Sequence, residues 1–372
     1  YATITGSALP DNLIKDMSPT VLEGDGNLSV QVSSSQLVEL RDALNYVLEY
    51  PYGCVEQTTS SMMPWLALGG FENLFPGQLD AAKRKDAIQR GVNRLLTMIT
   101  EHGGLSYWPG GKEPSLSGSA YGGFALLKAR EAGATVPKEV IDELLDYLSK
   151  QLRHVDDERD TTTLVDDAFA LYTLAKGGKS EPAYANMLYL RRAKLPPIAK
   201  LFLALSMCID NAPEAQIKNL VTGDSPDFGK WSHWSGTKVN NALRLIVYAH
   251  LGMSNEAKDL LSTILGQRNG RGEWGNTFTN GWTLFALAGY ERSLKRDDAP
   301  VTIDATWDEL KAKLELPTPA SLAKAEFPLT TTQVKKPFKL ALPKDRHTYA
   351  RVEARSWSKL REFAGSNNGC GI

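Results

Sequence analysis

Four segments of the chain repeat one pattern of small and aliphatic residues, and this repetition restricts the available folds more than any other feature. The segments AYGGFALLKAREAG, DDAFALYTLAKGG, NNALRLIVYAHLG and NGWTLFALAGY begin at residues 120, 166, 240 and 280. Each fits one short helix that ends near Gly or Tyr, and each can be paired with an amphipathic helix before it. We therefore predict a mainly α fold, a closed ring of helical hairpins known as an α/α toroid.

Two stretches show the pattern expected of the amphipathic partners. Apolar residues recur at intervals of four, three and four residues between 88 and 99, which places them on one face of a helix. A second set, Val140, Leu144 and Leu148, follows Pro137, a residue that the first turn of a helix tolerates. Charged residues lie between the members of this set and would face water.

Both ends of the chain show the alternation typical of β-strands. Apolar and polar residues alternate over 28–32 near the N-terminus, and again over 338–342 and 350–354 near the C-terminus. We therefore predict two β segments that flank the helical region.

These patterns divide the chain into three parts. We assign residues 1–35 to a first β flank, 36–316 to the helical toroid and 317–372 to a second, truncated β flank. The first residues, YATITGSALP, form neither a signal peptide nor a natural start. We expect the chain to be a piece of a longer protein.

Charge and cysteine content exclude several classes of function. The 42 Lys and Arg against 43 Asp and Glu give a net charge of −1, which provides no basic surface for nucleic acid. The three cysteines cannot form a disulfide framework, and their spacing lacks the paired ligands of a zinc site. No apolar stretch is long enough to span a bilayer. We expect no metal, no cofactor and no membrane contact from this chain.

The stretch that carries chemistry is YPYGCVEQTTSSMMPW, residues 50–65. Its proline and glycine predict a turn directly before Cys54, and the residues from Glu56 onward favour the start of a helix. Cys54 and Gln57 should therefore lie at a helix N-terminus, where backbone N–H groups stabilise negative charge.

This spacing allows an internal thioester between Cys54 and Gln57. The Gln57 side chain can fold back so that the Cys54 sulfur attacks its Cδ and ammonia leaves. An amine that later attacks this carbonyl stays covalently attached while the Cys54 thiolate departs. Water would react in the same way, so the site has to be kept dry. The aromatic residues Tyr50, Tyr52 and Trp65 are near in sequence, and we expect them to shield it.

The segment PYGCVEQTT resembles the thioester motif G-C-x-E-Q of the alpha-2-macroglobulin and complement family. The resemblance assigns the sulfur to Cys54 and the acyl carbon to Gln57. Gly53 and Glu56 match the turn and acidic positions, and Val55 occupies the variable one. In that family an α/α toroid is inserted between two halves of a β-sandwich CUB domain, which is similar to the order predicted above.

The resemblance also implies a function. In this family a protease cuts a bait region, the thioester is uncovered, and a lysine amine of the protease is captured. That would make the chain part of a single-turnover protease inhibitor rather than an enzyme, with attacking proteases and the remaining macroglobulin domains as its partners. The chain is most similar to the bacterial branch, whose members are periplasmic and lipid-anchored to the inner membrane.

Three alternatives stay open at this point. The aromatic loops around Trp108, Trp274 and Trp282 could form the sugar platform of a glycan-active toroid enzyme. A cysteine hydrolase would need a histidine near Cys54, and His102 is the nearest candidate along the chain. A scaffold module with an inactive thioester would have the same sequence signature.

Overall fold

The computed structural model describes most of the chain in two compact units. The described residues are 2–6, 26–41, 43–44, 53–153, 161–222, 236–294, 299–317, 321–330, 332–333, 336–343 and 348–356. A β unit comprises Tyr1–Val38 and Arg296–Ile372, and a helical unit comprises Glu39–Lys295.

The helical unit contains a closed inner ring of helices. The ring members are α3 (Val55–Ala67), α5 (Leu116–Glu131), α7 (Thr161–Lys176), α9 (Pro197–Ile209), α11 (Thr237–His250) and α13 (Thr277–Ser293). Each ring helix contacts the next one, and α13 contacts α3, which closes the ring. The inner helices are buried on most sides; in α9, for example, all residues from 198 to 208 are buried. The predicted α/α toroid is confirmed.

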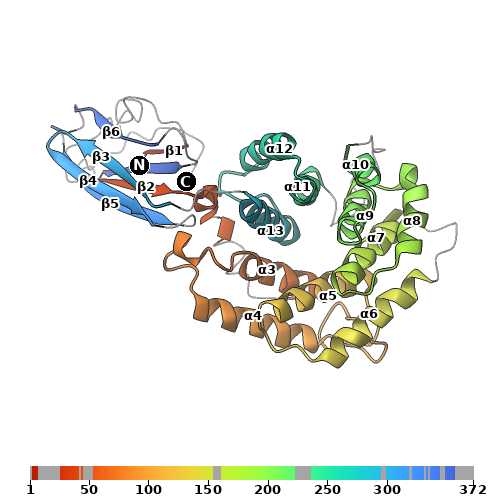
Figure 1. Ribbon diagram of the computed structural model, residues 1–372. Coiled ribbons are helices and arrows are strands. Elements are labelled where there is room, and N and C mark those ends of the chain that lie inside the picture. The colour runs from red at the N-terminus through yellow and green to blue at the C-terminus, as the bar shows by residue number, and fades with distance from the viewer. Residues whose placement is uncertain are drawn as a thin grey trace, which may run out of the picture. The chain divides into compact units, whose positions relative to one another are not determined.

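A second layer of helices lies outside the ring (Figure 1). Its members are α4 (Ala81–Leu96), α6 (Lys138–Leu152), α8 (Pro182–Leu190), α10 (Glu214–Thr222) and α12 (Ser254–Gly266). Ile88, Val92 and Leu95 form the buried stripe of α4, as predicted. Ile99 differs from the prediction, because α4 ends before it and Ile99 instead forms a β-bridge with Leu105.

The four repeated segments of the sequence all fall on ring helices, namely α5, α7, α11 and α13. Their small residues allow close packing. A Cβ added at Gly123 in α5, for example, would come within 2.4 Å of the Leu144 side chain in α6. Ring and outer helices therefore interlock where glycine leaves space for a larger neighbour.

Aromatic side chains fill the centre of the ring around Trp282, which is fully buried. Its ring contacts those of Tyr121, Phe124, Phe169, Tyr172, Phe202, Phe278 and Phe285. These residues come from α5, α7, α9 and α13, so one aromatic cluster joins most of the ring.

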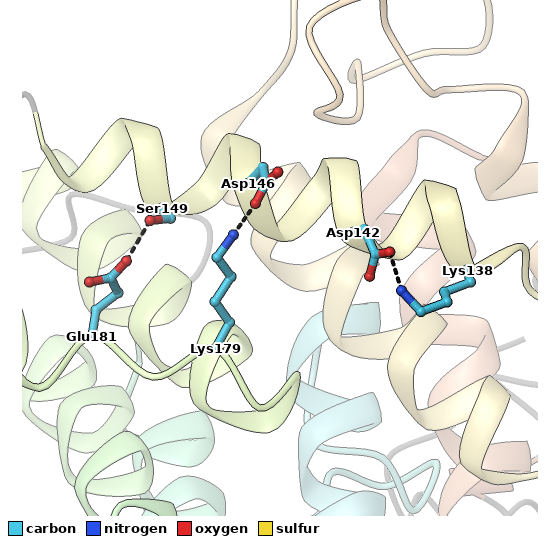
Figure 2. A network of polar contacts seen from close by, with 6 residues as sticks. All are labelled: Lys138, Asp142, Asp146, Ser149, Lys179 and Glu181. Carbon is cyan, nitrogen blue, oxygen red and sulfur yellow. Dashed lines mark hydrogen bonds and ion pairs between the residues drawn. The ribbon is translucent and has the colours of Figure 1, made fainter.

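Surface contacts also join the outer helix α6 to the segment before α8 (Figure 2). Lys179 pairs with Asp146, and Ser149 donates a hydrogen bond to Glu181, while Lys138 and Asp142 pair within α6. Exposed pairs of this kind contribute little to stability.

Among the described residues, no helix is long and apolar enough to cross a membrane.

The β unit contains two antiparallel sheets (Figure 1). The strands are β1 (Ala2–Gly6), β2 (Gly26–Ser33), β3 (Val301–Trp307), β4 (Leu310–Leu316), β5 (Leu322–Leu329), β6 (Phe338–Leu340) and β7 (Tyr349–Ser356). One sheet has the order β1-β7-β2-β5 and the other β4-β3-β6. Alternate residues of both sheets, including Val30, Trp307 and Val352, meet in one apolar core.

Strands from the two predicted β flanks pair with each other in one of these sheets. β2 comes from the first flank and lies between β5 and β7 of the second, with Val30 opposite Ala325 on one side and Val352 on the other. The mainly helical fold with flanking β segments agrees with the predicted fold class.

The predicted end of the helical region, at residue 316, is too late. α13 ends at Ser293, and residues 301–316 form the hairpin of β3 and β4. The segment LKAKLEL consists of strong helix formers, but its apolar residues alternate, which suits a half-buried strand. Asp308 adopts the left-handed conformation (φ 54°) that lets the chain turn between the two strands.

Candidate functional site

Cys54 and Gln57 lie together at the start of α3. Cys54 is the N-cap residue, with extended backbone angles and a side chain only 3% exposed. The two residues form a reciprocal capping box, in which the Cys54 sulfur accepts from the Gln57 backbone N–H. In return the Cys54 N–H donates to Oε1 of Gln57 at 3.4 Å. The local structure thus folds the Gln57 side chain back toward Cys54.

Gly53 fits its position because no other residue has room there. An added Cβ would lie 2.7 Å from Thr58 Oγ1, 3.0 Å from Thr58 N and 3.3 Å from Gln57 Cβ. The Thr58 N–H is already bonded to the Cys54 carbonyl at 3.0 Å, so this turn cannot easily move away. The guanidinium of Arg94 donates to the Gly53 carbonyl at 3.3 Å. These contacts hold the chain directly before the cysteine.

Val55 fixes the same turn from the other side. It is fully buried and faces two glycines of α5. A Cβ at Gly118 would meet Val55 Cγ1 at 2.7 Å, and one at Gly122 would meet Val55 Cγ2 at 3.2 Å. The start of α3 therefore sits closely against α5.

Glu56 connects this turn to two other ring helices. Its carboxylate accepts hydrogen bonds from Thr277 Oγ1 in α13, at 2.9 and 3.2 Å, and from Ser60 Oγ at 2.6 Å. Ser60 Oγ in turn lies 3.1 Å from the Tyr121 hydroxyl in α5. The acidic residue between Cys54 and Gln57 is therefore part of a polar network.

Tyr107 lies beside Cys54, and Trp108 packs against Tyr107. They belong to the loop between α4 and α5, and the Val55 N–H donates to the Tyr107 carbonyl at 3.0 Å. The Tyr107 hydroxyl is hydrogen-bonded to the Cys54 side chain. The two aromatic rings contact each other edge to face and are 46% and 56% exposed, whereas Cys54 is buried.

The surroundings of Tyr107 alter its acidity. The hydrogen bond to Cys54, partial burial and the charges of Cys54 and Glu56 together raise the pKa of the Tyr107 hydroxyl to about 12. Tyr107 therefore stays a neutral hydrogen-bond donor over the whole physiological pH range.

Of the three residues predicted to shield the thioester, the structure describes one. Tyr50 and Tyr52 lie outside the described residues. Trp65 is eleven residues after Cys54 on the same helix, which places it about 16 Å further along at the usual helical rise. Trp65 therefore does not lie against Cys54, whereas Tyr107, from the loop between α4 and α5, does.

The structure disfavours two of the alternatives. Trp274 and Trp282 are buried, and the Trp274 indole N–H donates to the Ile264 carbonyl at 2.6 Å, so neither presents a sugar platform. Of the three tryptophans named for this role, Trp108 alone is exposed. His102 is exposed on a turn, and within the described part of the chain no histidine is hydrogen-bonded to Cys54. The same residues contain no cluster of His, Cys, Asp and Glu that could hold a metal.

The fold and the site define a class of structure, a helical ring between β segments with a Cys-x-x-Gln box at the start of a ring helix. In sequence the chain is 27% identical to alpha-2-macroglobulin of Escherichia coli K12 over 286 residues, which is 71% of this chain and 17% of that protein. It is 28% identical to alpha-2-macroglobulin of Xylella fastidiosa Temecula1 over 171 residues, 44% of this chain and 10% of that protein. No family model matches the chain.

Solved structures of bacterial alpha-2-macroglobulins share the fold. Native E. coli alpha-2-macroglobulin, from domain MG7 to its C-terminus, gives a TM-score of 0.65 at 19% identity and covers 96% of this chain and 57% of that one. Salmonella alpha-2-macroglobulin reacted with methylamine gives a TM-score of 0.66 at 19% identity, covering 98% of this chain and 24% of that one.

These comparisons confirm the resemblance to bacterial alpha-2-macroglobulin that the sequence predicts. The chain spans less than a fifth of the length of the curated relatives that it matches. Its similarity therefore concerns one region of those proteins.

Proposed function

We propose that this chain is the thioester-bearing region of a bacterial protease trap of the alpha-2-macroglobulin kind. The observation that carries the proposal is the Cys54–Gln57 capping box, found in a helical ring that is similar to part of those proteins. In the proposed inhibitor each thioester reacts once, so the chain is not an enzyme. The β unit would be a CUB-like domain.

The geometry suits closure of the thioester. The Cys54 sulfur bonds to Cδ of Gln57, the bond from Cδ to the amide nitrogen breaks, and ammonia leaves with the thiol proton. The tetrahedral intermediate carries negative charge on Oε1, the atom to which the Cys54 N–H already donates. The helix N-terminus adds further stabilisation of this charge.

In the capture of an amine, nitrogen attacks Cδ of Gln57 and the Cys54 sulfur is the leaving group. A lysine nitrogen bonds to Cδ, the bond from Cδ to sulfur breaks, and the Cys54 thiolate takes up the proton that the amine loses. The neutral Tyr107 hydroxyl would donate to the departing sulfur, while Tyr107 and Trp108 limit access of water beforehand. Both residues thereby favour storage of the acyl group over hydrolysis.

The partners follow from the proposal. Structures of E. coli alpha-2-macroglobulin activated by trypsin and by porcine elastase resemble this chain with TM-scores of 0.55 and 0.56, each at 20% identity. We infer that proteases are the captured molecules here and that further macroglobulin domains carry the bait region. A periplasmic, lipid-anchored full-length protein would place the trap where foreign proteases arrive.

The test is the intact mass of the 372-residue chain before and after methylamine, with thiol titration alongside. We expect a mass one ammonia below the sequence value, then a methylamine adduct on Gln57 and one new thiol. Cys54→Ala should abolish both changes. A mass equal to the sequence value, with Cys54 free from the start, would contradict the proposal and favour an inactive scaffold.

A further inference from the structure

The hydrogen bonds of Glu56 have a defined direction. An ionised carboxylate only accepts, so both Thr277 and Ser60 donate their hydroxyl protons to Glu56. Because the Ser60 proton is used in this way, the Tyr121 hydroxyl must donate to Ser60 Oγ. The chain of donors therefore runs from α5 through α3 to Glu56, and a second donor reaches the same carboxylate from α13.

Among the described residues, Thr277 is the direct hydrogen-bond partner of Glu56 that comes from another helix. It is buried at the first position of α13 and reaches both carboxylate oxygens, at 2.9 and 3.2 Å. Ser60, in contrast, lies one turn further along α3 itself. Thr277 therefore determines where the Glu56 side chain sits relative to the ring.

The first turn of a helix needs such an external contact. Its N–H groups have no partner within the helix, so this turn frays most easily. Residues 54–57 form the first turn of α3, and both reacting side chains belong to it. Near the other end of the same two helices, the Arg292 guanidinium donates to the Ala67 and Gly69 carbonyls. Hydrogen bonds thus join α3 and α13 near both ends, and Thr277 makes the one at the end that carries Cys54 and Gln57.

We propose that Thr277 is a positioning residue for the thioester: by holding Glu56, it keeps the first turn of α3 in the geometry in which the Cys54 sulfur meets Cδ of Gln57. The inference rests on the proposed function. A displacement of about 1 Å between reacting groups lowers a rate by about a hundredfold, so a single hydroxyl at this point has a large effect on closure.

Thr277→Val tests this directly, because valine keeps the shape and removes the hydroxyl. We expect closure of the thioester, followed as loss of one ammonia by intact mass during refolding, to slow by about 10- to 100-fold. Thr277→Ser should restore the wild-type rate, since serine supplies the same donor. The matched control is Thr283→Val on the same helix, whose buried hydroxyl donates to the Thr279 carbonyl of its own helix. In this control variant the thioester should close at the wild-type rate.

Hydrogen exchange separates positioning from loss of fold. In Thr277→Val the amides of Val55, Glu56 and Gln57 should exchange faster, while those of α9, across the ring, should be unchanged. Equal acceleration in α9 would show general loosening and overturn the proposal, as would closure of Thr277→Val at the wild-type rate. If the wild-type chain itself never closes, both this inference and the proposed function fail; if only the variant result fails, the proposed function stands.

Discussion

Replacing Gly53 with alanine should disturb the turn that carries Cys54 and Gln57. The added Cβ would lie 2.7 Å from Thr58 Oγ1 and 3.0 Å from Thr58 N, and the latter is part of the α3 backbone. Side chains can rotate away, but the backbone nitrogen can move only if the turn moves with it. The turn that would shift also carries Cys54 and Gln57.

Two opposing effects set the change in the free energy of unfolding. Overpacking of this kind costs about 1–3 kcal/mol, whereas replacing glycine by alanine reduces the entropy of the unfolded chain and returns about 0.4–1 kcal/mol. We expect Gly53→Ala to lower the free energy of unfolding by about 1–2 kcal/mol, or Tm by about 2–8 °C for a unit of this size. Closure of the thioester should slow by about a hundredfold.

Thermal unfolding and the intact-mass time course measure these two effects. The matched control is Gly289→Ala in α13, where an added Cβ has nothing within 4 Å. This control should gain about 0.5–1 kcal/mol from helix propensity and close normally. If Gly53→Ala unfolds at the wild-type temperature and closes at the wild-type rate, the steric explanation of this glycine is wrong.

Two further predictions concern acidity. Because the pKa of Tyr107 is raised from 10 to about 12, the unfolded chain releases this proton first, and the contribution of Tyr107 to stability should be lost between about pH 10 and 12. The measurement uses protein in which methylamine has freed Cys54. The absorbance titration of the Tyr107→Phe variant is subtracted from that of the wild type, and the difference should show a transition near pH 12. A transition near pH 10 would contradict the hydrogen bond. Burial raises the pKa of the Cys208 thiol to about 12, so a thiol reagent at mildly alkaline pH should leave Cys208 unlabelled in the folded chain and label it after unfolding, as peptide mapping can show.

The ring could be predicted because its signal is local and repeated. The small-residue pattern marks α5, α7, α11 and α13 but not α3 or α9. The sequence of α9, PIAKLFLALSMCI, is largely apolar and contains no glycine. The strands were also visible, because alternation needs only neighbouring residues. The hairpin at 301–316 falls outside the predicted β flanks, and only its second strand, LKAKLEL, has helix-forming residues that conflict with its alternating pattern.

The site was predicted only as far as the motif extends. Cys54, Gln57 and Gly53 act within one turn, so their spacing is informative. The aromatic neighbour of Cys54 is Tyr107, in the loop between α4 and α5, and nothing in the sequence near Cys54 indicates that contact. Thr277 is further still from Glu56 along the sequence, and the two residues meet only because α13 packs against α3 in the folded ring.

The position of β2 in its sheet has a consequence for the order of synthesis. β2 is made before the ring, but its partners β5 and β7 are made after it, near the end of the chain. On the ribosome the whole ring can therefore fold, and the capping box can form, while β2 still has two open edges. Bringing strands so far apart in sequence together is slow, and unpaired edges invite association with other chains. β5 and β7 thus cover the two edges of β2 once they emerge.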